Sequence, residues 1–205
     1  MKIEFVTGSM FSGKSREIID FLEHFEAQNK KALVLKPQFD TRDFLCIKSR
    51  DRERQFSAMG IRKEVNPFTQ EEFDVFPSFR KGEFDNIDVI VVDEAQFLSN
   101  NGIRWLVQLS DAYGIPLILA GLTYDFRGEV FPAIQYLADN YGERVKVYQL
   151  KAICFNCQEL RLTHSCRVLN GEIVLEGAVN EIGDSEKYIA ICDDCLKEKL
   201  ERKGE

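Results

Sequence analysis

The stretch from Gly8 to Ser15 reads GSMFSGKS and fits the pattern G-x-x-x-x-G-K-[S/T]. In such a loop the backbone N–H groups and the N-terminus of the following helix face phosphate oxygens. The lysine reaches the β- and γ-phosphates, and the hydroxyl ligates Mg²⁺. We therefore predict that Lys14 binds the phosphates of a triphosphate and that Ser15 ligates Mg²⁺. The predicted nucleotide-binding loop, called the phosphate loop below, consists of Gly8, Ser9, Met10, Phe11, Ser12, Gly13, Lys14 and Ser15. The pattern does not identify the phosphate acceptor, which can be water, a protein, a nucleotide or a nucleoside.

Two acids follow an apolar run in VIVVDE, at Asp93 and Glu94. In open α/β sheets ligands bind beyond the carboxyl ends of the strands. One acid there can hold the magnesium shell, and the other can accept a proton from an attacking hydroxyl. The structural alternative is that both acids only cap the strand. Nucleic-acid helicases carry boxes similar to DEAQ, but they need two motor domains, and about one domain of chain precedes the cysteines.

Two cysteine pairs lie 34 residues apart, Cys154-x-x-Cys157 and Cys192-x-x-Cys195. Four thiolates suit a tetrahedral, closed, structural Zn²⁺ site. The usual separation of such pairs is shorter, about 15–20 residues, so a long loop is expected between them. Free thiols or a redox pair are the alternatives. No chemical role is predicted for the remaining cysteines and histidines, which are Cys46, Cys166, His24 and His164.

The composition indicates a soluble, cytoplasmic protein. Lys and Arg number 27 and Asp and Glu 34, for a net charge of -7, so the chain lacks the overall basic character of a nucleic-acid binder. The longest apolar run, VIVV, is far too short to span a membrane, and no secretory signal is visible. In the reducing cytoplasm, paired cysteines favour metal binding over disulfides.

Strand-like and helix-like segments alternate along residues 1–150, which predicts an α/β fold with a mainly parallel sheet. The expected strands are residues 2–8, 31–37 (ended by Pro37), 87–92, 115–122 and 144–150. The expected helices are 14–29, 69–76 (capped by Thr69), 100–114 and 132–141. Residues 151–205, the cysteine segment, contain short strand-like pieces and a charged C-terminal helix.

Together these parts resemble the zinc-containing thymidine kinases of bacteria, animals and some viruses. The resemblance covers nearly the whole chain and is carried by GSMFSGKS, KPQFDTR, VDEAQF, GLTYDFRGEVFP, CFNC, EIGDSEKY and CDDC. It implies a RecA-like P-loop domain over residues 1–150 and a small zinc-binding domain over residues 151–205, whose lasso loop closes over the nucleoside. The implied reaction transfers the ATP γ-phosphoryl group to the 5′-hydroxyl of thymidine, with deoxyuridine as a second expected acceptor. A homotetramer and feedback inhibition by thymidine triphosphate are also implied.

The resemblance assigns roles by position. It implies that Glu94 is the catalytic base, that Lys14 and Arg42 assist the transfer and that Asp93 joins Ser15 at the Mg²⁺. Further nucleotide contacts fall on Asp40, Thr41, Arg42, Ala95 and Gln96. The thymidine contacts fall on Phe97, Phe126, Phe131, Val179, Asn180, Glu181, Ile182, Gly183 and Tyr188.

The chain departs from the family pattern at four places. Thr123 stands where an aspartate is frequent, and Asp184 stands where a second lasso glycine is common. His164 occupies the place of a threonine that many members carry, with Thr163 one residue away. Asp193 follows the third cysteine, where many members have arginine.

Two other classes of function stay open on the sequence. A P-loop ATPase acting on nucleic acid would need nucleic acid, and no nucleoside, for turnover. A nucleotide sensor would bind ATP tightly without transferring a phosphoryl group. The intact set of Lys14, Ser15, Asp93 and Glu94 argues against the sensor.

Overall fold

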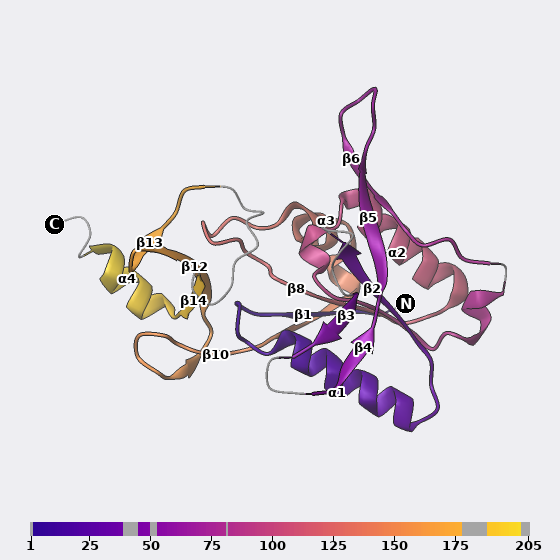
Figure 1. Cartoon of the computed structure of the whole chain (residues 1–205), viewed down its shortest axis with the longest axis horizontal. Helices are drawn as coiled ribbons and strands as arrows, with labels where there is room; N and C mark the ends of the chain where they lie inside the picture. Colours follow the sequence, from indigo (N-terminus) through magenta and orange to yellow (C-terminus); the bar gives the residue numbers. More distant parts are fainter. Residues whose placement is uncertain (1, 39–44, 50–52, 81, 178–187, 202–205) are drawn as a thin grey trace.

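A seven-stranded sheet forms the centre of the protein (Figure 1). The structure is a computed structural model and describes residues 2–38, 45–49, 53–80, 82–177 and 188–201. The strand order is β6-β5-β2-β7-β8-β1-β9, and all neighbours are parallel except β5 and β6. The strands are β1 (Ile3–Thr7), β2 (Ala32–Gln38), β5 (Met59–Val65), β6 (Glu72–Val75), β7 (Val89–Val92), β8 (Leu117–Gly121) and β9 (Val145–Gln149). The predicted mainly parallel α/β architecture is confirmed.

Helices cover both faces of this sheet (Figure 1). The helix α1 (Lys14–Ala27) packs on one face through Ile18, Ile19 and Leu22, and the small hairpin of β3 (Cys46–Lys48) and β4 (Gln55–Ser57) packs beside it. The other face is covered by α2 (Asn100–Tyr113) and α3 (Pro132–Tyr141). All four residues of β7 are buried, because a central parallel strand is covered on both sides. Short 3₁₀ turns η1 (Glu83–Asn86), η2 (Ala95–Phe97) and η3 (Gly142–Arg144) connect these elements.

The prediction of a helix over residues 69–76 is wrong, because that stretch contains β6, paired antiparallel with β5. A turn joins the two strands, and Asn66 builds it. Its Oδ1 accepts hydrogen bonds from the N–H groups of Phe68 and Thr69, at 2.9 and 3.3 Å. Asparagine followed by proline favours such a turn. Thr69 therefore lies in the turn and caps no helix.

The expectation that Pro37 ends its strand is also wrong, since β2 continues to Gln38. Pro37 is paired with Ile61 of β5, whereas the pairing of β2 with β7 already ends at Leu35. A proline lacks the N–H that a strand with two neighbours uses. Pro37 is tolerated because, in the part of the chain that the structure describes, only β5 pairs with β2 at this position.

A buried aspartate fastens the β5–β6 hairpin to the start of α2. Oδ2 of Asp74 accepts hydrogen bonds from the backbone N and the Oγ of Ser99, at 2.7 and 2.8 Å. Ser99 is also the N-cap of α2 and accepts from the N–H of Gly102 at 3.0 Å. On the other side, Nζ of Lys63 lies 2.7 Å from Oδ1 of Asp74, whose side chain is 1% exposed.

We expect Asp74→Ala to lower the free energy of unfolding by about 2–4 kcal/mol, because it leaves a buried N–H and an ammonium group without their partner. Urea denaturation measures this change. Asp88→Ala is the matched control, since Asp88 also accepts a backbone hydrogen bond, from Lys31 at 2.7 Å, but at an exposed position. A loss in the control as large as that in Asp74→Ala would contradict the role given to Asp74.

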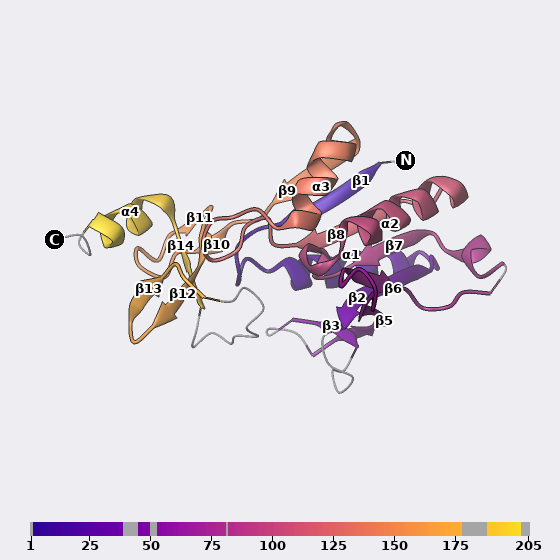
Figure 2. The ribbon, with the colours of Figure 1, turned by 90° about the horizontal axis from the view of Figure 1, so that it is seen from above.

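The cysteine segment folds beside the α/β part as short antiparallel strands and one helix (Figure 2). Its strands are β10 (Ala152–Ile153), β11 (Leu160–Arg161), β12 (His164–Leu169), β13 (Glu172–Val174) and β14 (Tyr188–Ile191), and its helix is α4 (Asp193–Glu201). The predicted short strands and charged helix are confirmed. Among the described residues, none of the helices combines the length and apolar character that crossing a membrane requires.

Candidate functional site

The carboxyl ends of the neighbouring strands β7, β8 and β1 lie side by side, along the edge of the sheet formed by the C-terminal ends of its parallel strands. These strands are neighbours and parallel, and Thr7 at the end of β1 is in register with Gly121 at the end of β8. The loops that leave this edge contain the phosphate loop, the segment DEAQF and the segment GLTYDF. The topology therefore brings together three motifs that lie far apart in the sequence, at the place where open α/β sheets bind ligands.

Two glycines give the phosphate loop its shape. A Cβ on Gly8, which has φ 156°, would lie 2.5 Å from Oγ of Ser12 and 2.9 Å from the carbonyl oxygen of Leu150. Gly13 has φ 84° and is the N-cap of α1. Only glycine fits both requirements, a close approach in one case and a left-handed backbone in the other.

The Lys14 side chain lies along the loop. Its Nζ donates hydrogen bonds to the carbonyl oxygens of Gly8, at 3.1 Å, and Ser9, at 2.8 Å. Burial lowers the pKa of Lys14, while the neighbouring charges of Glu94 and Asp93 act in the opposite direction. The ammonium group therefore lies in the electric field of both acids.

Asp93 is a buried carboxylate that follows β7. It is 4% exposed, and its Oδ1 accepts a hydrogen bond from the N–H of Glu94 at 3.0 Å. Burial, and next the charge of Glu94, raise the pKa of Asp93 from 3.8 to about 6. An ionised Asp93 is thus costly in the absence of a cation and is suited to binding one.

This cost yields a prediction for stability. Because the folded state raises the pKa of Asp93, the folded protein is penalised as the pH rises through about 6. At pH 8 without Mg²⁺, we expect Asp93→Asn to raise the free energy of unfolding by roughly 1–3 kcal/mol. The gain should shrink toward pH 4, where the wild-type carboxyl is protonated in the folded protein and only about half ionised in the unfolded chain. Urea denaturation at both pH values, without chelators that remove zinc, measures it. An equal gain at both pH values would contradict the assigned cause.

Glu94 has an unusual backbone and a fixed side chain. Its φ of 55° is left-handed, a conformation that residues other than glycine adopt mainly under constraint and often at functional sites. Its Oε2 accepts a hydrogen bond from Nε2 of Gln96 at 2.6 Å, and Oε1 of Gln96 accepts from the N–H of Leu122 at 3.1 Å. Gln96 is 3% exposed and therefore links Glu94 rigidly to the end of β8.

The four expected aromatic residues form two pairs. Phe97 and Phe131 meet edge to face, with ring centroids 5.8 Å apart, and Phe131 belongs to the core beneath α2 and α3. Phe126 of the α/β part meets Tyr188 of the cysteine segment edge to face at 6.5 Å. Phe126 and Tyr188 are 4% and 8% exposed, so this second pair is a buried aromatic contact between the two parts of the chain. Several other expected site residues lie outside the described residues, namely Asp40, Thr41, Arg42, Val179, Asn180, Glu181, Ile182 and Gly183.

The structure adds polar contacts that the sequence did not single out. Oγ1 of Thr7 and Oγ1 of Thr123 lie 2.8 Å apart, so the departure at Thr123 joins the ends of β1 and β8. The cysteine segment reaches the phosphate loop through Thr163 and Ser165. Single hydroxyl residues about 155 positions from their partners carry no sequence pattern, so these contacts were not predicted, although Thr163 was noted beside the place of a family threonine.

The four paired cysteines converge. The sulfur atoms of Cys154, Cys157, Cys192 and Cys195 all lie within 4.8 Å of one another. The Sγ atoms of Cys157 and Cys192 are 3.9 Å apart, close to the roughly 3.8 Å edge of a ZnS₄ tetrahedron with Zn–S bonds of about 2.3 Å. The geometry is therefore compatible with a zinc site.

The other cysteines and the histidines lie outside this cluster. Burial raises the pKa of Cys166 to about 11, which makes it an inert thiol. Sγ of Cys46 contacts Oε1 of Gln55 at 3.5 Å. His164 is ion-paired with Asp193 when protonated, so two of the departures from the family pattern contact each other.

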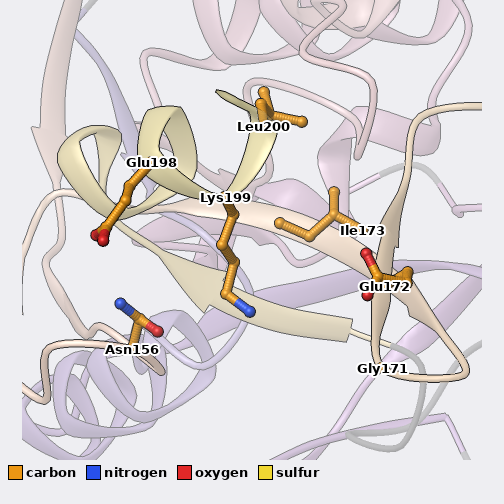
Figure 3. A pocket seen from close by; sticks show the side chains of 7 residues that line it. All are labelled: Asn156, Gly171, Glu172, Ile173, Glu198, Lys199 and Leu200. Carbon is orange, nitrogen blue, oxygen red and sulfur yellow. The ribbon is translucent and has the colours of Figure 1, made fainter. Parts of the chain in front are cut away.

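A pocket of about 260 Å³ lies within the cysteine segment, between α4 and the β12–β13 turn (Figure 3). It is lined by Asn156, Gly171, Glu172, Ile173, Glu198, Lys199 and Leu200. None of these residues is an expected site residue. The pocket is therefore separate from the place at the ends of β7, β8 and β1 where the motifs meet.

Comparisons with known proteins agree on one family. The family described as "Thymidine kinase" matches residues 1–196. A thymidine kinase of Streptococcus pyogenes serotype M3 is 31% identical over 188 residues, 90% of this chain and 91% of that protein. A thymidine kinase of Enterobacteria phage T4 is 32% identical over 192 residues, 92% of this chain and 91% of that protein. The solved structure of Bacteroides Pif1 bound to ssDNA aligns with a TM-score of 0.41 and 12% identity, over 73% of this chain and 38% of that one, which is too low to indicate function.

Proposed function

The chain belongs to the thymidine kinase family, whose members phosphorylate thymidine with ATP, and we propose that the edge of the sheet at β7, β8 and β1 is its active site. The observation that carries the proposal is the convergence of Lys14, Asp93 and Glu94 at this edge. Phosphoryl transfer needs mainly positioning and stabilisation of charge. A lysine beside two carboxylates, in a glycine-shaped loop at the start of a helix, provides both.

In this proposal the phosphate loop holds the triphosphate of ATP. Its backbone N–H groups and the start of α1 face the phosphates. The buried Oγ of Ser12 has no hydrogen-bond partner within the described part of the chain, and a phosphate oxygen would satisfy it. Lys14 exchanges the carbonyl oxygens of Gly8 and Ser9 for phosphate oxygens. Asp40, Thr41 and Arg42 are proposed to contact the phosphates from the next loop.

Asp93 and Ser15 would hold the Mg²⁺, since a carboxylate and a hydroxyl are the oxygen ligands that this cation prefers. When bound, the cation would supply positive charge that offsets the negative charge of the phosphates. The buried Asp93 fits this role, because its ionised form lacks solvation in the folded protein.

Glu94 is the proposed base that accepts the proton of the thymidine 5′-hydroxyl. A base must be held within hydrogen-bond reach of the proton it accepts. Gln96 and the short turn through Ala95 hold the Glu94 carboxylate in place. The nucleoside base would lie against Phe126 and Tyr188, with Phe97, Phe131 and residues 179–183 completing the pocket.

The cysteine cluster is proposed to hold a structural Zn²⁺, since four thiolates leave no open position for chemistry. Residues 1–150 and 151–205 are accordingly proposed as two domains, for nucleotide binding and for zinc binding with the lasso loop. A homotetramer, inhibition by thymidine triphosphate and a cytoplasmic location stay predictions.

The selectivity of the site can be tested with a set of nucleosides. Purified protein, Mg²⁺ and ATP would be incubated with thymidine, deoxyuridine, deoxycytidine, deoxyadenosine, deoxyguanosine or uridine, and the monophosphates quantified. We expect thymidine and deoxyuridine to be phosphorylated and the purine nucleosides and deoxycytidine to react little. Preferential phosphorylation of deoxycytidine or of a purine nucleoside would contradict the proposed pocket.

A further inference from the structure

Two hydrogen bonds join the cysteine segment to the phosphate loop. The backbone N–H of Met10 donates to Oγ of Ser165 at 2.7 Å. The hydroxyl oxygens of Ser9 and Thr163 lie 2.6 Å apart. Oγ of Ser9 also donates to the carbonyl oxygen of Met10 at 3.0 Å, so its single proton is used there and Thr163 is the donor to Ser9. Ser9 and Ser165 are 6% and 7% exposed, so these side chains are largely shielded from solvent.

The two contacts act on different parts of the loop. Thr163 hydrogen-bonds to the side chain of Ser9, whose Oγ in turn donates to the Met10 carbonyl oxygen, whereas Ser165 accepts directly from a backbone N–H of the loop. Phosphate loops bind through their backbone N–H groups, so the direction of each peptide unit decides how many of them face the anion. A serine that fixes the Met10 peptide therefore acts on the part of the loop that recognises ATP.

The position of Ser165 is itself set by the cysteine cluster. Ser165 on β12 is paired with Ala190 on β14, two residues before Cys192. The carbonyl oxygen of Ala190 accepts a hydrogen bond from the N–H of Phe155 at 2.7 Å, directly after Cys154. Both cysteine pairs are thus connected through one short strand to the serine that holds the loop.

We propose that Ser165 is a positioning residue for ATP, which holds the Met10 peptide of the phosphate loop in its binding conformation. The cysteine segment then forms part of the ATP site as well as carrying the lasso. The proposal rests on the proposed function, because it assumes that the phosphate loop binds ATP. It concerns ATP alone and predicts no direct contact of Ser165 with thymidine.

The test compares Ser165→Ala with Thr163→Val, a control of matched volume that removes the other hydroxyl contact. Titration calorimetry without thymidine gives the Kd of ATP. We expect Ser165→Ala to raise this Kd roughly tenfold, because a buried N–H loses its acceptor, and Thr163→Val to change it by less than about twofold. Hydrogen exchange of the Met10 amide should be faster in Ser165→Ala and unchanged in Thr163→Val. The KM for thymidine should stay within about twofold in both.

Three results would overturn the proposal. One is an unchanged Kd of ATP in folded Ser165→Ala. Another is an equal rise of the Kd of ATP in both variants, which would indicate that both hydroxyl contacts serve only to dock the cysteine segment on the α/β part. The third is a raised KM for thymidine with an unchanged Kd of ATP. If Ser165→Ala does not fold, Ser165→Cys keeps the volume with a weaker acceptor and should show the same ordering. Phosphorylation of thymidine by the wild-type protein tests the proposed function separately.

Discussion

Glu94→Gln should lower kcat for thymidine phosphorylation by about 10²–10⁴-fold, the usual contribution of a general base. The amide has nearly the shape of the carboxylate, and its oxygen can still accept the hydrogen bond from Gln96 that orients residue 94. What the variant loses is the ability to accept a proton. ATP binding relies on the phosphate loop, so the Kd of ATP should stay within about twofold.

Steady-state kinetics and calorimetry on the purified variant measure both quantities. Glu94→Asp is the informative control, since it keeps a carboxylate but shortens its reach, and its kcat should lie between those of Glu94→Gln and the wild type. Near-normal turnover in Glu94→Gln would remove Glu94 from the mechanism. A weakened Kd of ATP with an unchanged kcat would instead assign the residue to nucleotide binding.

Cys157→Ser should abolish the zinc site and unfold the cysteine segment. Structural Zn²⁺ contributes on the order of 10 kcal/mol to the folding of small metal-binding units. The substitution removes one of four sulfur atoms that lie within 4.8 Å of one another. Because Cys157 is only half-buried, replacing sulfur by oxygen leaves at most a small cavity. The loss of stability therefore reports mainly the lost zinc ligand. The zinc content measured by elemental analysis should fall from one ion per chain to nearly none. The cysteine segment should also lose its protection from hydrogen exchange.

The same substitution at Cys166 provides the comparison, because that thiol is buried but lies outside the cluster. Cys166→Ser should retain one zinc per chain and lose only about 1–3 kcal/mol of stability, the cost of burying a hydroxyl. Retention of zinc and of normal stability in Cys157→Ser would show that the cluster is not a structural metal site.

The parallel sheet could be predicted because its strands are buried and its helices are amphipathic. VIVV is continuous and apolar because β7 is covered on both faces, and Ile18 and Leu22 repeat at the helical period. The strand β6 could not be predicted in this way. Its residues are exposed or half-buried at an edge of the sheet, so hydrophobic burial imposes no strong pattern, and the Asn66 turn decides the pairing.

The candidate site likewise contains residues that could be predicted from the sequence and residues that could not. The phosphate loop and the pair Asp93–Glu94 were predictable because short contiguous motifs carry their chemistry. The aromatic residues show the limit of sequence reasoning, since pocket lining and core packing require the same residue types. Phe131 and Phe126 are both buried, at 7% and 4% exposure, but Phe131 packs in the core of the α/β part and Phe126 packs against Tyr188. The hydrogen bond of Ser165 to the loop depends on the docking of distant segments, which no local pattern encodes.

The most direct test of the account is the transfer of label from γ-labelled ATP to thymidine, with two analogues alongside. Thymidine and 3′-deoxythymidine both carry the 5′-hydroxyl, and 5′-deoxythymidine lacks it. The account predicts labelled monophosphate from the first two and none from the third. Label in 5′-deoxythymidine, or label released only as inorganic phosphate in the presence of thymidine, would contradict it.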